Sequence, residues 1–155
     1  TCALPIFRKV CMSPCAPISF DQLNQRVLAC QDKAFTLAFY ILGNTTAACG
    51  AVQKAFLQVY ANRGNDDNNI SVKILQEVIL MCRPAKPSKA HSAIEEIPGW
   101  ELLDCCEQEA LLLVDVLQES YQNAARILNN SESDIARVVA QGRYKLIRNS
   151  DSVQE

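Results

Sequence analysis

The sequence has little glycine, few aromatic side chains and only one histidine. Glycine accounts for 5 of the 155 residues, and Phe, Trp and Tyr together make up 6%. No glycine-rich phosphate loop occurs. The one histidine, His91, lies in a proline-rich stretch, so no Cys/His or Ser/His/Asp arrangement falls on predicted structured segments. We therefore expect neither an enzyme nor a bound cofactor.

Long hydrophobic runs and a strong excess of one charge are also lacking. No uninterrupted apolar run has the length that spans a bilayer. Residues 1–18 lack the continuous apolar core of a signal peptide. These two absences predict a cytoplasmic protein. The net charge of -2 argues against a non-specific nucleic-acid coat, which is usually strongly basic, but leaves room for a local basic stripe.

Cysteine is abundant, with eight residues at positions 2, 11, 15, 30, 49, 82, 105 and 106. Most fall at apolar positions of helix-like segments, where a free thiol behaves as a small hydrophobe, and disulfides are rare in the cytosol. Redox sensing or metal binding by Cys11 and Cys15, or by Cys105 and Cys106, is the alternative. Helical neighbours point about 100° apart, and no zinc-ligand spacing occurs, so we expect no metal site.

Helical periodicity dominates the chain, which predicts an all-α fold made of two small helical domains. Residues 1–18 carry three prolines and are expected to form an N-terminal tail. Helices are predicted at 19–42, with a break near Gln31-Asp32, at 45–62 and at 69–82. Ser19 can cap the first helix, and Gly43-Asn44 can close it in the left-handed conformation.

Residues 84–99 contain three prolines and mixed charge without a helical period. This change in composition predicts a linker between one domain at 19–83 and a second at 100–148, followed by a tail at 149–155. The second domain begins with a short helix near 100–105 and a strongly apolar helix at 107–117.

The two helices predicted next form the most informative segment. Ser120 can cap a helix over 121–128, and Asn129-Asn130 tolerates a left-handed turn. Ser131 and Asp134 then provide a start that is similar to a capping box. Two short helices joined by so tight a turn must cross at a wide angle, which predicts a helix-turn-helix at about 121–148.

The last helix presents a polar stripe. Arg137, Gln141, Tyr144 or Lys145, and Arg148 recur at three- or four-residue spacing, with Arg143 beside them. Arg and Gln suit bidentate contacts with guanine and adenine edges in the major groove, whereas Lys and further Arg suit phosphates. An ordinary solvated basic face is the alternative interpretation.

These segments resemble extracytoplasmic-function sigma factors over residues 19–148. The run Glu109-Ala-Leu-Leu-Leu-Val-Asp-Val116, with Ser120-Tyr121, Ala125-x-Ile127-Leu128, Ser131-Glu132 and Arg143-x-x-Leu146, is similar to their fourth conserved region. Ala34-Phe35, Leu42-Gly43-Asn44, Ala48 and Val52-Gln53-x-Ala55-Phe56-Leu57-x-x-Tyr60 are similar to their second region. The order of the two matches also agrees with the family.

The resemblance implies a role in transcription initiation. In that family the N-terminal domain binds the clamp of core RNA polymerase and captures the melted −10 promoter element, and the C-terminal domain reads the −35 element with its last helix. An anti-sigma factor is a further partner to expect. The resemblance places polymerase contacts at Gln53, Lys54, Leu57 and Gln58, and DNA contacts at Ser133, Arg137, Gln141, Arg143, Tyr144, Lys145 and Arg148.

The chain departs from the family pattern at both expected surfaces. The acids usual near the start of the second helix are replaced by Thr46, Ala47 and Cys49, and no aromatic residue lies between Tyr60 and Trp100. Residues 100–148 hold eight acidic and five basic side chains, a net charge of -3. A second hypothesis is therefore a degenerate sigma-like protein that acts through protein contacts, as an anti-sigma ligand, polymerase decoy or subunit, without melting a promoter.

Overall fold

The computed structural model describes residues 19–62, 69–85 and 97–152, and these residues form helices and turns without a strand. The predicted all-α fold class is confirmed. We call residues 19–85 the N-terminal half and residues 97–152 the C-terminal half. Cys2, Cys11, Cys15, His91 and most of the predicted linker lie outside the described residues.

The N-terminal half contains α1 (Phe20–Ala29), α2 (Gln31–Leu42), α3 (Thr45–Ala61), α4 (Ile70–Cys82) and the short 3-10 helix η2 (Arg83–Ala85). The predicted caps are present: Ser19 and Gln22 form a reciprocal capping box, and Gly43 has φ of 64°. The expected break falls at Cys30, one residue before the predicted position. Its backbone N–H bonds to Val27 O at 3.1 Å, which closes α1.

Helices α2, α3 and α4 pack against one another around the apolar centre of this half. Leu37, Ile74 and Leu75 are completely buried there, because they lie on the inward faces of α2 and α4. Phe35 and Phe56 pack against this core but remain half-buried. The core thus fixes α3 with one side inward and the opposite side exposed to solvent.

The C-terminal half contains η3 (Trp100–Leu102), α5 (Cys105–Leu111), the π-helix η4 (Leu112–Val116), α6 (Tyr121–Leu128) and α7 (Glu132–Ser152). The segment near 100–105 is a 3-10 turn, and the apolar helix begins at Cys105 because Asp104 and Glu107 form a capping box. The same helix changes to π geometry at Leu112. There Leu117 N bonds to Leu112 O at 2.9 Å, a bond that spans five residues.

The connection between α6 and α7 agrees with the local signals in the sequence. Ser120 caps α6 by accepting from Asn123 N, and Asn129 ends it in the left-handed region with φ of 55°. Ser131 Oγ accepts from Asp134 N at 3.1 Å at the start of α7. Helix α7 runs on to Ser152, beyond the predicted end at 148. The use of this pair as a DNA-binding helix-turn-helix stays a prediction.

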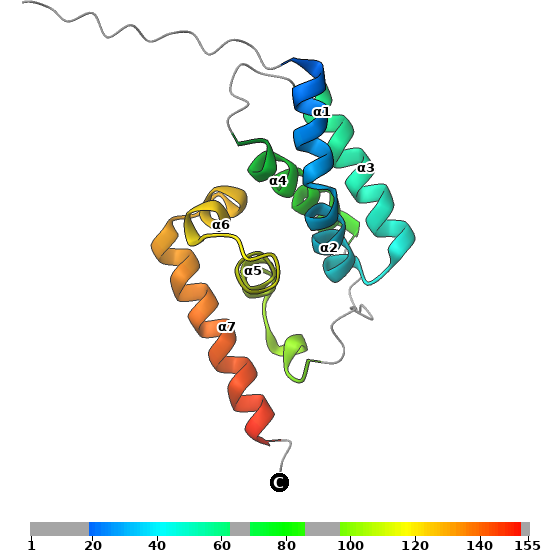
Figure 1. The fold of residues 1–155 in the computed structure, drawn as a ribbon. Coiled ribbons are helices and arrows are strands. Elements are labelled where there is room, and N and C mark those ends of the chain that lie inside the picture. Colours follow the sequence, from blue (N-terminus) through cyan, green and yellow to red (C-terminus); the bar gives the residue numbers. More distant parts are fainter. Residues whose placement is uncertain (1–18, 63–68, 86–96, 153–155) are drawn as a thin grey trace, which may run out of the picture.

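The helices of the two halves lie against one another. Figure 1 shows α5 between α7 and the N-terminal half, and α6 beside α4. One cluster of buried side chains includes Leu75 and Ile79 of α4 together with Leu112, Ala124 and Ile127 of the C-terminal half. The contact between the halves is therefore apolar at its centre.

The cysteines only partly agree with the prediction that they occupy apolar positions. Cys30 and Cys82 are buried, whereas Cys49, Cys105 and Cys106 are exposed, and none of these five forms a disulfide. The difference has a simple cause for two of them, since Cys105 and Cys106 lie on the exposed side of the first turn of α5. Within the described ranges no group of three or more His, Cys, Asp and Glu residues could hold a metal ion. None of the described helices has the length and apolar character needed to span a membrane.

Candidate DNA-reading and protein-binding surfaces

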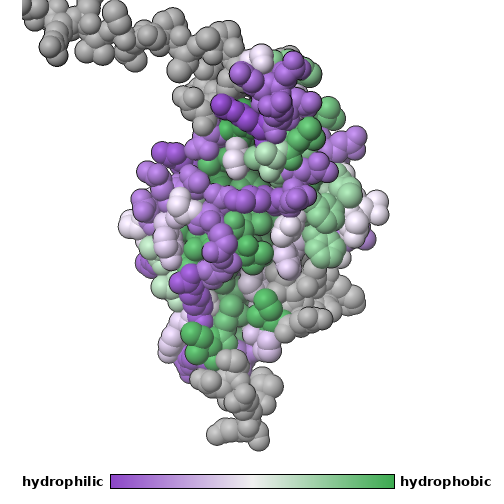
Figure 2. All heavy atoms as spheres, viewed as in Figure 1, coloured by the Kyte–Doolittle hydropathy of each residue, from purple (hydrophilic) through white to green (hydrophobic). Residues whose placement is uncertain are grey.

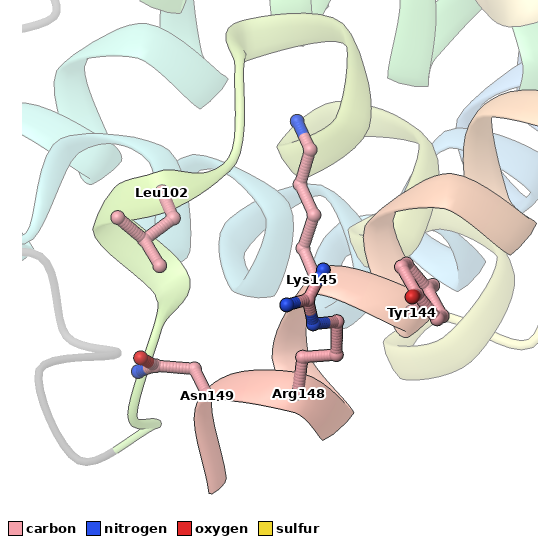
Figure 3. A pocket seen from close by; sticks show the side chains of 5 residues that line it. All are labelled: Leu102, Tyr144, Lys145, Arg148 and Asn149. Carbon is pink, nitrogen blue, oxygen red and sulfur yellow. The ribbon is translucent and has the colours of Figure 1, made fainter. Parts of the chain in front are cut away.

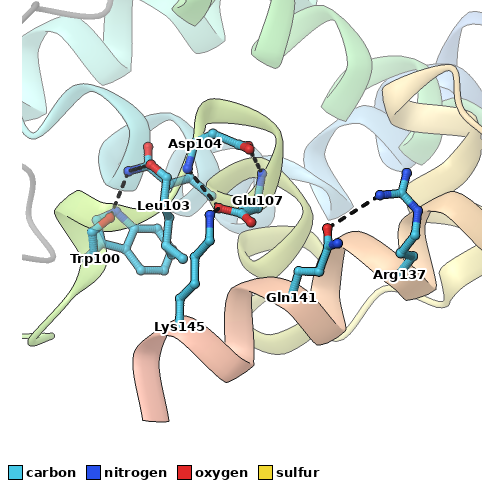
Figure 4. Close-up of polar contacts among 8 residues, drawn as sticks. Trp100, Leu103, Asp104, Glu107, Arg137, Gln141 and Lys145 are labelled. Atoms are coloured by element: carbon cyan, nitrogen blue, oxygen red, sulfur yellow. Dashed lines mark hydrogen bonds and ion pairs between the residues drawn. The ribbon is translucent and has the colours of Figure 1, made fainter. Parts of the chain in front are cut away.

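The outer face of α7 carries part of the predicted DNA-reading stripe. Arg137 and Gln141 are both exposed, and Arg137 Nη1 lies 3.4 Å from Gln141 Oε1 (Figure 4). Arg137 Nη2 also donates to Asp134 Oδ1 at 3.2 Å, one turn earlier. These three residues form a polar ladder along a solvent-facing side of the helix.

Asp134 is the acid that competes for Arg137. Hydrogen bonds from the Ser131 hydroxyl and then from Arg137 hold the pKa of the Asp134 carboxyl below its usual value. The side chains of Arg137 and Asp134 are 60% and 52% exposed. An exposed pair of this kind is screened by solvent and contributes little to stability, so Arg137 can exchange Asp134 for another acceptor. Ser133, also exposed, lies in the same first turn with its Oγ 3.0 Å from Ser131 Oγ.

Arg143 is held by an acid from the preceding helices. Its guanidinium makes two hydrogen bonds to Asp115 of η4. Nε donates to Oδ2 at 3.1 Å, and Nη2 donates to Oδ1. The hydrogen bonds from Arg143 to Asp115 raise the pKa of the guanidinium further above its ordinary value. The pair links α7 to η4, with the side chains of Arg143 and Asp115 still 48% and 39% exposed.

Lys145 is committed in the same way to α5. Its Nζ donates to Glu107 Oε2 at 2.7 Å (Figure 4). The Glu107 side chain is only 5% exposed, and its carboxylate also accepts from Asp104 N at 2.9 Å. Because the ammonium neutralises a buried carboxylate, its first role is to stabilise the contact between α5 and α7.

Gly142 allows α7 to approach α5 closely between these two cations. A Cβ at this position would lie 2.8 Å from Leu111 Cδ1 and 3.6 Å from Glu107 Cβ. Gly142 is itself buried. Its role in close packing was not predicted, since the partner Leu111 lies far away along the chain.

The C-terminal part of α7 carries the remaining predicted residues. Arg148 lies over the Tyr144 ring, with Cζ 5.8 Å from the ring centroid. Both side chains line a shallow groove of about 310 Å³ together with Leu102 of η3, Lys145 and Asn149 (Figure 3). Tyr144 and Ile147 are 60% and 61% exposed. Hydrophobic side chains accordingly interrupt the hydrophilic surface toward this end of α7 (Figure 2).

The four residues predicted to contact polymerase all lie exposed on α3: Gln53, Lys54, Leu57 and Gln58. Leu57 is 62% exposed, a large apolar side chain on an otherwise polar face. Beside this face runs a groove of about 530 Å³ between α3 and the first two helices. Its lining is largely apolar and comprises Leu28, Gln31, Asp32, Phe35, Cys49, Val52, Gln53 and Phe56.

The acids that hold the cations of α7 were not predicted from the sequence. Glu107 is paired across 38 residues and Asp115 across 28, so no local spacing reveals them. A signal was present, because Glu107 and Glu109 are carboxylates within a strongly apolar helix. Such carboxylates are buried only when they are paired.

The thiol of Cys82 has no reactive character. Burial, and then the nearby carboxylate of Glu109, raise its pKa to about 12. Partial desolvation, and then the carboxylates of Asp104 and Glu109, also raise the pKa of the exposed Cys106. Thiolates are the reactive form of cysteine, so the buried Cys82 is a poor nucleophile and a poor metal ligand at neutral pH.

No protein-family model matches the sequence, and no curated protein matches it. Solved structures similar to this chain do exist. CnrH, in its complex with the cytosolic domain of CnrY, has a TM-score of 0.70 and 17% identity, over 86% of this chain and 90% of that one. The sigma factor RpoE from Bartonella quintana, in its complex with the anti-sigma factor NepR, has a TM-score of 0.65 and 16% identity, over 83% of this chain and 96% of that one. The chain therefore has the fold of extracytoplasmic-function sigma factors, proteins that are not enzymes.

Proposed function

We propose that the chain is a sigma-factor-like regulator of transcription initiation that binds core RNA polymerase through α3 and promoter DNA through the outer face of α7. The exposure of Leu57 carries the proposal. Leaving a leucine in water rather than burying it costs roughly 1.5–3 kcal/mol, a cost that a protein partner would remove. Gln53, Lys54 and Gln58 surround it with hydrogen-bond donors, as at the rim of a protein interface. This function would place the protein in the cytoplasm.

The outer face of α7 supports a limited contact with the −35 element. Arg137 and Gln141 point outward together and have the chemistry for bidentate contacts with bases. Ser133 in the first turn and Arg148 near the other end suit phosphates. Arg143 and Lys145, predicted for the same task, are secondary contributors here because Asp115 and Glu107 already neutralise them.

A second candidate is a sigma-like protein that acts through protein contacts without melting a promoter. The neutralised cations of α7 favour it, since each lost phosphate contact lowers affinity for DNA. The two similar structures also point to protein partners, because both are complexes with another protein. Binding to an anti-sigma factor, a decoy role on polymerase, or membership of a larger assembly would all use this mode.

The polymerase contact is tested by binding of the purified full chain to core RNA polymerase. Leu57→Asp should lower the affinity at least about tenfold, since it replaces roughly 1.5–3 kcal/mol of apolar burial with a charge. Leu102→Asp is the matched control, because Leu102 is 55% exposed on the other half of the molecule. Absence of binding by the unaltered chain, or equal effects of the two variants, would exclude the α3 contact.

The DNA contact is tested by titration with a promoter duplex at several salt concentrations. Arg148→Gln, which removes a cation assigned to a phosphate, should make the slope of log affinity against log salt shallower by about 0.9, the value for one phosphate contact. A chain that binds polymerase but no promoter duplex at any salt concentration would favour the second candidate.

A further inference from the structure

The groove of about 530 Å³ between α3 and the first two helices, here called the α3 groove, is apolar and carries one charge. Phe35 and Phe56 are half-buried in it, and Leu28, which also lines it, is 55% exposed. Asp32 is exposed and is the one charged side chain among the residues that line the groove. Contiguous apolar surface left in water marks a place where another group binds. An occupant that complements this groove therefore carries apolar side chains and a positive charge.

The segment that precedes α1 has this chemistry in its sequence. Residues 1–18 lie outside the described residues, but they hold two basic side chains, Arg8 and Lys9, and no acidic one, a net charge of +2. Ile6 and Phe7 stand directly before this pair. Two large apolar side chains followed by two cations match an apolar groove that contains one carboxylate.

The start of α1 lies close to one end of the α3 groove. The Tyr60 hydroxyl donates to Asn24 Oδ1 at 2.7 Å, and the Phe20 and Tyr60 rings are 6.0 Å apart. These contacts place the C-terminal end of α3 beside α1 (Figure 1). Phe56 of the groove lies about one turn before Tyr60 on α3. A chain that enters α1 at Ser19 therefore passes near this end of the groove.

The length of the segment is sufficient to reach the groove. From Phe20 to Leu28, α1 rises about 12 Å. Residues 10–18, when extended, span about 30 Å, so residues 6–9 can lie in the groove with length to spare. A segment tethered this closely has an effective concentration of the order of 1 mM, so a contact made by a few side chains is enough to fill the groove.

We propose that residues 6–9 of this same chain occupy the α3 groove. The apolar part of the groove takes Ile6 and Phe7, and Asp32 pairs with one of the two cations that follow them. The docking goes beyond the proposed function and does not depend on it.

Two further groups are covered when the groove is filled. One is the exposed Cys49 thiol, which lines the groove and forms no disulfide. The other is Gln53, which also belongs to the side of α3 proposed to contact polymerase. The docked segment would therefore compete with polymerase at Gln53, a consequence that rests on the proposed function.

Alkylation of Cys49 by a maleimide measures the docking in the full chain. Phe7→Asp should raise the rate at Cys49 at least about tenfold, because a carboxylate then replaces the ring inside an apolar groove. Ser13→Asp adds the same charge elsewhere in the segment and should change the rate less than about twofold. Cys105, exposed on the other half, is the internal reference. Equal rates at Cys49 in the unaltered chain and in Phe7→Asp, or an equal rise at Cys105, would overturn the proposal.

A reversal of charges tests the pairing with Asp32. Arg8→Glu with Lys9→Glu should raise the rate at Cys49 at least about threefold, because two acids then face Asp32. Adding Asp32→Lys should return it to within about twofold of the unaltered chain. Asp21→Lys is the matched control, because Asp21 is likewise exposed in the first turn of a helix but does not line the groove. Recovery with Asp21→Lys, or with neither change, would contradict the pairing.

Other occupants of the groove give different results. If a second copy of the chain filled it, alkylation of Cys49 would slow as the protein concentration rises, whereas docking within one chain is independent of concentration. If only another protein filled it, Cys49 would react equally fast in every variant of the purified chain. Either result would overturn the proposal.

Competition with polymerase has its own measurement. Phe7→Asp should bind core RNA polymerase more tightly than Ser13→Asp does, because the groove is then open. Equal binding would exclude competition at Gln53, while the slow alkylation of Cys49 would still support the docking. Absence of polymerase binding by every variant would count against the proposed function and not against the docking.

Discussion

The two sides of α7 use their cations differently. On the outer side, Arg137 makes an exposed pair with Asp134 of the same helix. On the inner side, which faces α5 and η4, Lys145 pairs with the buried Glu107 and the partly exposed Arg143 pairs with Asp115. From their positive charge alone, Arg137, Arg143 and Lys145 were equal candidates for contact with DNA. The difference teaches that the availability of a cation is decided by acids elsewhere in the chain, and that a narrow outer strip is left for recognition.

The largest expected effect comes from the inner side. Lys145→Met should lower the free energy of unfolding by about 2 kcal/mol, because the Glu107 carboxylate is then left buried without its counter-charge. Arg137→Met, the matched change on the outer side, should cost less than about 0.5 kcal/mol. Denaturant titration of both variants measures the difference.

A double variant sharpens this comparison. Glu107→Gln keeps the side chain that the capping box with Asp104 requires but removes the buried charge. Combined with Lys145→Met, it should recover most of the lost stability. If Lys145→Met and Arg137→Met destabilise equally, the distinction between the two sides of α7 is wrong.

A smaller effect is expected where α7 touches α5. Gly142→Ala places a methyl group 2.8 Å from Leu111 Cδ1, and overpacking of this kind costs about 1–3 kcal/mol. The gain in helix propensity, about 1 kcal/mol, offsets only part of that. We expect a net loss of about 1 kcal/mol in thermal or denaturant unfolding.

Gly50 of α3 provides the control for that substitution. A Cβ there meets nothing within 4 Å, so Gly50→Ala should stabilise the chain by about 0.5–1 kcal/mol through helix propensity alone. A stabilising Gly142→Ala would show that Leu111 can move aside and that the inner side of α7 packs less closely than the structure indicates.

The smallest effect concerns DNA binding. Asp134→Asn releases Arg137 and removes an acid from the outer side, so promoter affinity should rise about threefold, a small gain because solvent and salt screen a charge this exposed. Asp115→Asn, the same change on the inner side, should leave affinity within about twofold at physiological salt. Fluorescence anisotropy with a labelled duplex measures both, and a larger gain from Asp115→Asn would mean that Arg143 contacts DNA.

Local signals in the sequence predicted much of the fold. Ser19, Gly43, Ser120 and Asn129 mark helix ends, because each satisfies or closes a helix terminus through neighbours only a few residues away. The predicted helix ends agree with the structure to within a few residues at most positions. The fold class is explained by helical periodicity alone.

The site could be predicted only in part. Spacing placed Arg137 and Gln141 correctly on a solvent-facing side, because that depends on helix geometry. It could not separate them from Arg143 and Lys145, whose partners lie 28 and 38 residues away. The pairing of Arg83 with Glu109 across the two halves was out of reach for the same reason. Long-range partners require the tertiary structure.

The π-helix at Leu112–Val116 determines the direction in which the chain between α5 and α6 turns. Glu119 N bonds to Leu113 O at 2.9 Å, six residues back, so the turn that ends this segment is wider than a turn of an α-helix. Each residue of an α-helix turns the chain by about 100°. Deleting one residue here would therefore rotate Glu119 away from Lys33, with which it forms an ion pair. It would also change the direction in which α6 lies on α4. The number of residues in this segment therefore decides whether the two halves can pack against one another.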